Sequence, residues 1–182
     1  MAKIVIFGSG GQAGRSLVAE ASRRGHEVTG VGRNPGLSAS LAAGYDVAIS
    51  AVYDAAADPF EFYSFAAREL VASGVRRIIV VGIYPLLEVS PGVRLIDTPS
   101  FPAEHKPFCL GHSAGVDVLR SSLVDWLVMS PVGNFGGEPV GRYGIGAVDP
   151  SDTLSYSDFA LAVLDEVSQP SFERTQVGIR SA

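Results

Sequence analysis

The apolar residues of this chain follow two alternating patterns. Runs at 4–7, 46–52, 77–81 and 125–130 are apolar on both faces, which is typical of strands buried in a parallel sheet. Residues 26–32 form a further predicted strand, with a short strand near 143–148 and a closing strand at 175–179. Helical spacing predicts helices at 12–24, 37–43, 60–73, 108–122 and 157–167, the last one capped by Ser155 or Ser157.

Strands that alternate with helices predict an α/β fold, a Rossmann-like doubly wound parallel sheet. The length of 182 residues suits a single domain spanning 1–182. Residues 83–107 interrupt the pattern, because five prolines and Gly92 exclude a long helix there. Loops of this length inside a domain usually serve a function, so we expect an irregular excursion on the substrate side.

The first strand enters a glycine cluster at 8–14, and a helix leaves it. Two spacings coexist, G-x-G-x-x-A at Gly8, Gly10 and Ala13, and G-x-x-G-x-x-G at Gly8, Gly11 and Gly14. Backbone N–H groups of such a turn, with the positive end of the helix dipole, suit a pyrophosphate. A purely structural glycine turn is the alternative. The residues expected to bind a dinucleotide are Gly8, Ser9, Gly10, Gly11, Gln12, Ala13 and Gly14.

Ligands of doubly wound sheets bind at the carboxyl ends of the strands, which draws attention to Arg33 and Asn34 after the second strand. An acidic residue at this position would select NAD through the ribose 2′-hydroxyl. Arginine instead suits a 2′-phosphate, and Asn34 adds an amide donor. We therefore predict NADP, with NADPH preferred over NADH, while an ordinary exposed turn is the alternative for Arg33.

The same rule nominates residues after the third, fourth and fifth strands. The predicted cofactor contacts there are Ala51, Val52, Gly82, Ile83, Pro131, Val132 and Gly133. Tyr84 is the candidate catalytic residue, either as a proton donor or as a stacking surface. Small residues that pack against helices, and a proline that ends a strand, would explain much of this set without a ligand.

Composition and charge narrow the classes of function. A net charge of −5 argues against nucleic-acid binding, and the pairs Arg23-Arg24 and Arg76-Arg77 are interpreted as solvated turns.

No apolar run approaches the ~20 residues that span a bilayer. Cys109 is the single cysteine, so an intramolecular disulfide is impossible. Met1 leads into a strand without the features of a signal peptide, and we expect a cytoplasmic protein.

His105, Cys109 and His112 could in principle form a metal site or a nucleophilic pair. Pro107 lies between the first two and disfavours a continuous helix across them. No further His, Cys or carboxylate cluster completes a ligand set, so no metal is predicted.

Together, the glycine turn, Arg33 and the fifth-strand motif resemble the atypical short-chain dehydrogenase/reductases of the NAD(P)H-binding, NmrA-like group. Within it the chain is similar to small NADH-flavin reductase-like proteins, relatives of the biliverdin reductase B and flavin reductase type. The matching segments are 4–14, 23–29, 31–35, 74–82, 125–131 and 155–160, and the resemblance covers nearly the whole chain.

The chain departs from this superfamily at two places. Many members carry a Tyr-x-x-x-Lys pair at the head of the helix after the fourth strand, where this chain reads Glu104-His105-Lys106-Pro107-Phe108-Cys109. The usual proton relay is therefore absent. Ile83-Tyr84-Pro85 stands where small members have a glycine- and alanine-rich run, which predicts restricted access to the nicotinamide.

The resemblance implies an NADPH-dependent oxidoreductase that transfers hydride to a flavin, a quinone or a related flat acceptor. Such acceptors take hydride directly, so loss of the tyrosine-lysine pair is tolerable, with solvent or Tyr84 as the proton source. The alternative is a non-catalytic NADP(H)-sensing regulator of the NmrA-like type, and a nucleotide-sugar epimerase is a weaker one. Apolar surface on the last helices suits a homodimer, although core packing explains the same residues.

Overall fold

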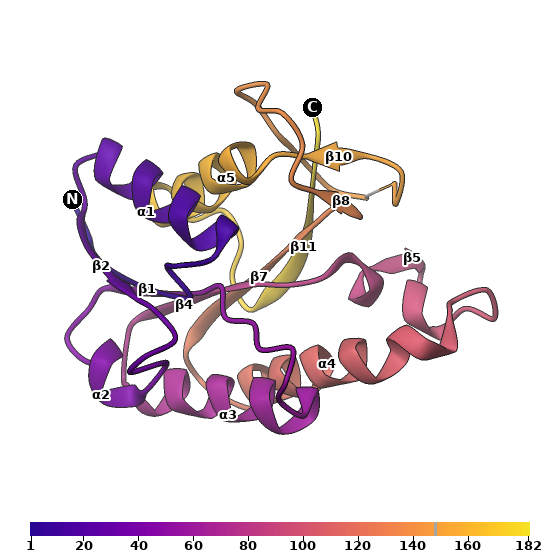
Figure 1. The fold of residues 1–182 in the computed structure, drawn as a ribbon, viewed down its shortest axis with the longest axis horizontal. Helices are drawn as coiled ribbons and strands as arrows, with labels where there is room; N and C mark the ends of the chain where they lie inside the picture. Colours follow the sequence, from indigo (N-terminus) through magenta and orange to yellow (C-terminus); the bar gives the residue numbers. More distant parts are fainter. Residues whose placement is uncertain (148) are drawn as a thin grey trace.

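A single seven-stranded sheet forms the middle layer of the computed structural model, which describes residues 1–147 and 149–182 (Figure 1). The strand order is β2-β1-β3-β4-β7-β11-β9. These strands are β1 (Lys3–Phe7), β2 (Glu27–Val31), β3 (Val47–Ser50), β4 (Arg77–Val81), β7 (Asp125–Pro131), β9 (Gly144–Ile145) and β11 (Thr175–Arg180). All neighbours pair in parallel except β9, which runs antiparallel to β11 at the edge.

Helices cover both faces of the sheet, so the predicted doubly wound α/β fold is confirmed. On one face lie α1 (Gln12–Arg23) and α5 (Tyr156–Ser168); on the other lie α2 (Ala39–Ala42), α3 (Pro59–Ala72) and α4 (Lys106–Arg120) (Figure 1). Within the described ranges, none of these helices has the length and apolar character needed to cross a membrane. Of the two candidate caps of α5, Ser155 is the one used, accepting a hydrogen bond from the Asp158 N–H at 2.9 Å.

Strand β1 shows why the buried strands are continuous apolar runs. Its side chains alternate between the two faces, with Ile4 and Ile6 in the core beneath α1 and α5, and Val5 and Phe7 in the core beneath α3 and α4. All four are completely buried. A strand that contributes to two cores has no face for polar residues.

Both long helices on the α3–α4 face begin earlier than expected. Predicted to start at 60 and 108, they start at Pro59 and Lys106, because proline is tolerated in a first turn whose N–H groups need no helical acceptor. Pro107 therefore does not separate His105 from the helix. At the other end, the helix predicted to run to 122 ends at Arg120, and Leu123 beyond it is 99% exposed.

The excursion at 83–107 is partly ordered into short elements. It contains the 3₁₀ helices η1 (Tyr84–Leu86), η2 (Leu95–Asp97) and η3 (Ala103–His105), and a small antiparallel pair of β5 (Glu88–Ser90) and β6 (Val93–Arg94). Leu86, Ile96 and Cys109 bury a small core that holds it against α4.

The glycine-rich stretch after β7 also contains more structure than expected. In addition to β9, it provides β8 (Asn134–Phe135), which pairs in parallel with β10 (Thr153–Leu154). The predicted strand near 143–148 is reduced to Gly144–Ile145, and Val148 lies outside the described residues.

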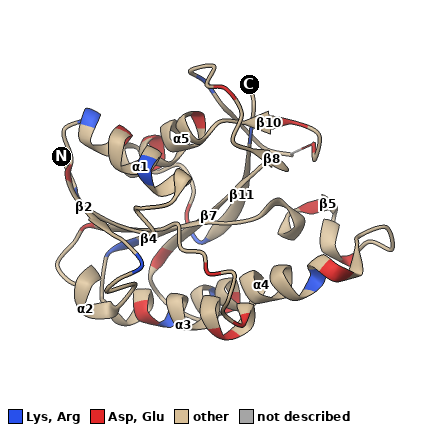
Figure 2. Cartoon of the chain, in the orientation of Figure 1, with Lys and Arg blue, Asp and Glu red and all other residues tan. Residues whose placement is uncertain are grey.

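Arg77 corrects the interpretation of the arginine pairs as solvated turns. Its side chain is 7% exposed and forms ion pairs with Asp125 on β7 and Glu166 on α5, the latter at 3.0 Å. It also donates to the Phe172 carbonyl at 2.9 Å. Its neighbour Arg76 is exposed as expected. In the view of Figure 2, basic and acidic residues are interspersed over both helical layers.

Candidate functional site

The glycine turn lies where the strand order reverses. From β1 the chain passes to β2 on one side and then to β3 on the other, and doubly wound sheets bind ligands at such a point. Gly8 has φ +79°, and a Cβ there would lie 2.2 Å from the Ala51 carbonyl oxygen. The N–H groups of Gly8 and Ser9 donate to the Val31 carbonyl at 2.9 and 3.1 Å. Strands β2 and β3 therefore clamp the turn from both sides.

Steric contacts favour one of the two glycine spacings. A Cβ on Gly14 would lie 2.1 Å from the Gly8 carbonyl oxygen, so only glycine lets α1 pack this closely on the turn. A Cβ on Gly10 would meet no atom within 4 Å. Gly11 is the N-cap of α1 and has no side chain to cap it. The packing thus requires Gly8 and Gly14, as in G-x-x-G-x-x-G, and leaves Gly10 open to the surroundings.

A cavity of about 360 Å³ adjoins this turn, and we name it the turn cavity. It extends over the carboxyl ends of β1, β2 and β3 to the start of α3. Its lining consists of Gly8, Gly10, Gly11, Gly32, Arg33, Gly36, Leu37, Ala51, Val52, Tyr53, Asp54, Phe62, Phe65 and Ala66. Glycines on one side and aromatic rings on the other give it one wall of backbone and one flat apolar wall.

Unpaired donors lie on the glycine turn and at the rim of the turn cavity. The N–H groups of Gln12 and Ala13, in the first turn of α1, have no acceptor among the described residues. Arg33 is exposed at the rim, and none of the ion pairs found in residues 1–147 and 149–182 includes it. A helix N-terminus and a free guanidinium both attract anionic oxygens. The electrostatics of this cavity therefore suit a phosphorylated ligand.

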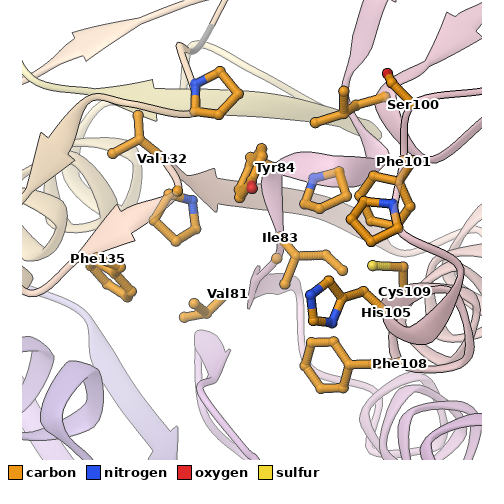
Figure 3. A pocket seen from close by; sticks show the side chains of 17 residues that line it. Val81, Ile83, Tyr84, Ser100, Phe101, His105, Phe108, Cys109, Val132 and Phe135 are labelled. Atoms are coloured by element: carbon orange, nitrogen blue, oxygen red, sulfur yellow. The ribbon is translucent and has the colours of Figure 1, made fainter. Parts of the chain in front are cut away.

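A second cavity, of about 580 Å³, lies at the carboxyl ends of β4 and β7 beneath the excursion (Figure 3). We name it the aromatic cavity because Tyr84, Phe101, Phe108 and Phe135 line it. The remaining lining residues are Val81, Gly82, Ile83, Pro85, Leu95, Ser100, Pro102, His105, Cys109, Pro131, Val132, Gly133 and Pro150. Ile83, Tyr84 and Pro85, which we expect to restrict access to the nicotinamide, are part of the lining of this cavity.

The two cavities share an aromatic wall. Tyr53, in the turn cavity, contacts Phe108, in the aromatic cavity, edge to face with ring centroids 6.1 Å apart. Phe108 is held from behind by Tyr63 and His112, at centroid distances of 6.0 and 4.9 Å. Burial lowers the pKa of His112 to about 3, so this imidazole is a neutral packing group. An extended ligand lying along the strand ends would contact both cavities at this wall.

Three side chains that line the aromatic cavity can donate or accept protons: Tyr84, His105 and Cys109. Cys109 is 3% exposed, and burial raises the pKa of its thiol. A protonated thiol is a poor nucleophile, which argues against a Cys-His pair. In the described part of the chain, no group of three or more His, Cys, Asp or Glu side chains is arranged to hold a metal.

The predicted site residues fall into three groups. Gly8, Gly10, Gly11, Arg33, Ala51 and Val52 line the turn cavity, and Gly82, Ile83, Tyr84, Pro131, Val132 and Gly133 line the aromatic cavity. Ser9, Gln12, Ala13, Gly14 and Asn34 line neither of the two. Of these, Gly14 supports the turn, and Gln12 and Ala13 present N–H groups.

Sequence reasoning missed most of the aromatic lining. Phe62 and Phe65 reach the turn cavity from α3, and Phe101 and Phe108 reach the aromatic cavity from the excursion and α4. The only signal was the 62/65 spacing on one helix face, which core packing would also explain. At the head of α4, where the superfamily pair would be expected, the structure places His105 at the rim of the aromatic cavity.

Comparison with known proteins gives matches over nearly the whole chain, although no family model matches. The uncharacterized protein YwnB of Bacillus subtilis is 30% identical, over 92% of this chain and 93% of YwnB. A solved "putative NADH-flavin reductase" of Streptococcus pneumoniae is 27% identical, covers 100% of both chains and has a TM-score of 0.90. A "putative exported protein" of Burkholderia pseudomallei is 33% identical, with 99% and 100% covered and a TM-score of 0.86.

Proposed function

Because the chain belongs to the family of YwnB, within the atypical short-chain dehydrogenase/reductases, we propose that it is an NADPH-dependent oxidoreductase that transfers hydride to a flat acceptor such as a flavin or a quinone. One observation carries this proposal: a phosphate-suited cavity and an aromatic cavity meet at the Tyr53–Phe108 wall. Two planar rings, one from the cofactor and one from the acceptor, could meet there. The flavin-reductase name of the pneumococcal relative agrees with this proposal.

The chain's own residues fit a dinucleotide. Glycine at 8 and 14 lets the turn pack closely against the end of β3 and the start of α1, and the free N–H groups at the head of α1 direct a positive dipole end toward the proposed pyrophosphate position. Around this turn, Ser9, Gly10, Gly11, Gln12, Ala13, Ala51 and Val52 complete the proposed adenosine and pyrophosphate contacts. Gly82, Ile83, Pro131, Val132 and Gly133 are the proposed neighbours of the nicotinamide.

Arg33 is proposed to bind the 2′-phosphate, with Asn34 as an additional donor, and so to favour NADPH over NADH. Replacing an exposed, unpaired arginine leaves no buried charge behind, so folding should be unaffected. Arg33→Ala is expected to weaken NADPH binding by about 1.5–3 kcal/mol, roughly 10- to 100-fold, and NADH binding by less than about twofold. Arg68→Ala, at an exposed position on α3, is the matched control. An equal loss for both cofactors would refute the assignment.

Bound dihydronicotinamide supplies a hydride, so the protein needs only to orient the acceptor and exclude water. The largely apolar and aromatic lining of the second cavity suits both tasks. Tyr84 is proposed to act there, either as a proton donor or as a surface on which the acceptor stacks. With the tyrosine-lysine pair absent from the head of α4, the chemistry does not depend on that relay.

The deciding experiment mixes the purified protein with NADPH and either FMN or a quinone, and follows absorbance at the nicotinamide band. Turnover above the protein-free background supports the reductase. Tight NADPH binding without turnover over a broad panel of acceptors would instead favour the NADP(H)-sensing regulator, in which occupancy changes a partner interface. A cytoplasmic location and a homodimer stay predictions. The apolar side chains of α5 that we considered for a dimer interface, such as Phe159 and Val163, pack in the core.

A further inference from the structure

His105 lies where a side chain can reach both the aromatic cavity and water. It ends η3 and is the N-cap residue of α4, and its imidazole lines the cavity beside Phe108 and Cys109 (Figure 3). The residue is nevertheless exposed overall, because η3 forms the rim of the cavity. A group in this position can exchange protons with solvent and deliver them to a bound ligand.

The other protonatable groups of the cavity are less suited to that task. Cys109 is buried, and its thiol has no route to solvent comparable to that of His105. Tyr84 is half-buried on η1, and a phenol releases its proton far less readily than an imidazolium near neutral pH. Imidazole is the side chain whose two protonation states both occur between about pH 5 and 8.

Charged groups of both signs surround His105. Glu104 precedes it and Lys106 follows it in the chain. Arg94 lowers the pKa of the Asp97 carboxyl, on η2, mainly through a 2.8 Å hydrogen bond, and the charge of Lys106 lowers it further. Tyr84, from η1, and the Cys109 thiol, one turn along α4, also line the cavity.

We infer that His105 is the proton donor of this site, and that the acceptor is a quinone or a similar conjugated carbonyl compound. The inference rests on the proposed reductase function and deepens it. When hydride reaches a quinone, the product before protonation is an oxyanion, which needs a proton at once. Reduced flavin, by contrast, is stable as an anion, so a donor in the cavity offers it little.

The step balances with the named reactants. Hydride from NADPH, which carries two electrons and one hydrogen, would add to one carbonyl oxygen of the quinone and leave the other oxygen as the oxyanion. The imidazolium of His105 then donates its N–H proton to the oxyanion, which gives the hydroquinone and a neutral imidazole. Water at the exposed rim returns a proton to His105. The sum is NADPH, quinone and one proton giving NADP⁺ and hydroquinone.

The first test needs no cofactor and no turnover. 4-Nitrophenol is flat, and its absorbance distinguishes the phenol from the phenolate. Titrated at pH 6 into the wild-type protein, it should show a phenolate band stronger than in buffer, because the imidazolium stabilises the anion. His105→Gln should remove this excess, whereas Glu104→Gln, on the same turn, should retain it. An unchanged spectrum with the wild-type protein, or an excess that persists in His105→Gln, overturns the inference.

The second test compares acceptors with NADPH. Duroquinone is the quinone probe, because its fully substituted ring leaves no position for addition of the Cys109 thiol. His105→Gln should lower kcat with duroquinone by about 10²-fold or more and abolish the fall of kcat with rising pH. The KM for NADPH and the rate with FMN should change by less than about threefold, and Glu104→Gln should match the wild type.

The outcomes of this second test separate the inference from the proposed function. If the wild-type protein reduces duroquinone and His105→Gln does so equally well, with the same pH profile, His105 is not the donor and the reductase stands. If the wild type reduces FMN and not duroquinone, the acceptor class is wrong. If no acceptor is reduced, the proposed function fails and this inference fails with it.

Discussion

Replacing Gly14 by alanine tests whether the packing of α1 on the glycine turn, and not ligand contact alone, demands glycine. The new Cβ would lie 2.1 Å from the Gly8 carbonyl oxygen and 2.7 Å from the Ser9 Cα. Both are backbone atoms, so no rotamer change relieves the clash. The turn itself cannot shift freely, because its N–H groups donate to the Val31 carbonyl at 2.9 and 3.1 Å.

The magnitude follows from two opposing terms. Overpacking of this kind costs about 3 kcal/mol at the upper end of its usual range, since the neighbours are backbone. Alanine in place of glycine inside a helix recovers about 1 kcal/mol. The net loss for Gly14→Ala is therefore about 2 kcal/mol, which in a chain of 182 residues lowers Tm by roughly 4–8 °C. At Gly10 a Cβ meets no atom within 4 Å, so Gly10→Ala should change stability by less than about 0.5 kcal/mol.

Urea unfolding followed by the fluorescence of Trp126, the single tryptophan and 3% exposed, measures both variants on one scale. NADPH binding by each folded variant is measured alongside. Gly10→Ala should retain stability and lose NADPH affinity, because Gly10 lines the cavity in which we propose the pyrophosphate binds. A wild-type urea midpoint for Gly14→Ala, or an equal loss of stability in Gly10→Ala, would show that the steric argument is wrong.

Two further predictions concern buried charge and pH. Arg77→Leu should destabilise the protein by about 3 kcal/mol or more, because Asp125 and Glu166 lose their buried partner, whereas Arg76→Leu should cost less than about 0.5 kcal/mol in the same urea assay. Equal urea midpoints for the two would contradict the buried network. Burial lowers the pKa of His112 to about 3, so between about pH 6.5 and 3 this side chain binds a proton in the unfolded chain but not in the folded protein. The stability of the folded protein therefore falls as the pH drops through this range. Between neutral pH and about pH 5, this proton uptake lowers the free energy of unfolding by about 2 kcal/mol. The free energy of unfolding of His112→Phe should therefore fall by about 2 kcal/mol less over the same pH range. An identical pH dependence of the two proteins would rule out the buried neutral imidazole.

Much of the fold is predictable from local pattern. The buried strands are continuous apolar runs because each contributes to two cores, as Ile4 and Val5 do on β1. Helix starts were less predictable: the helices predicted from 60 and 108 begin at Pro59 and Lys106, because proline fits a first turn. The helix predicted to end at 122 ends at Arg120, because helical spacing does not show where a helix ends.

The candidate site was predictable where the sheet topology alone decides it. Gly8, Arg33 and Ile83 each follow a strand, and parallel strands bring their carboxyl ends to one edge. Arg77 is the first residue of β4, but its buried ion pair depends on Glu166, 89 residues away. No local pattern contains such a partner.

The order and type of the main elements and the place of the glycine turn follow from local sequence patterns, because periodicity and turn chemistry act over a few residues. The steric requirement for glycine at Gly14, and not at Gly10, becomes visible only in three dimensions, since the clash lies between a helix and the turn before it. Only the structure joined Tyr53 to Phe108 and brought His105 to the aromatic cavity. These contacts join segments that strand order and the path of the irregular excursion bring together in space. Strand order and the path of the excursion produce no repeating pattern in the sequence.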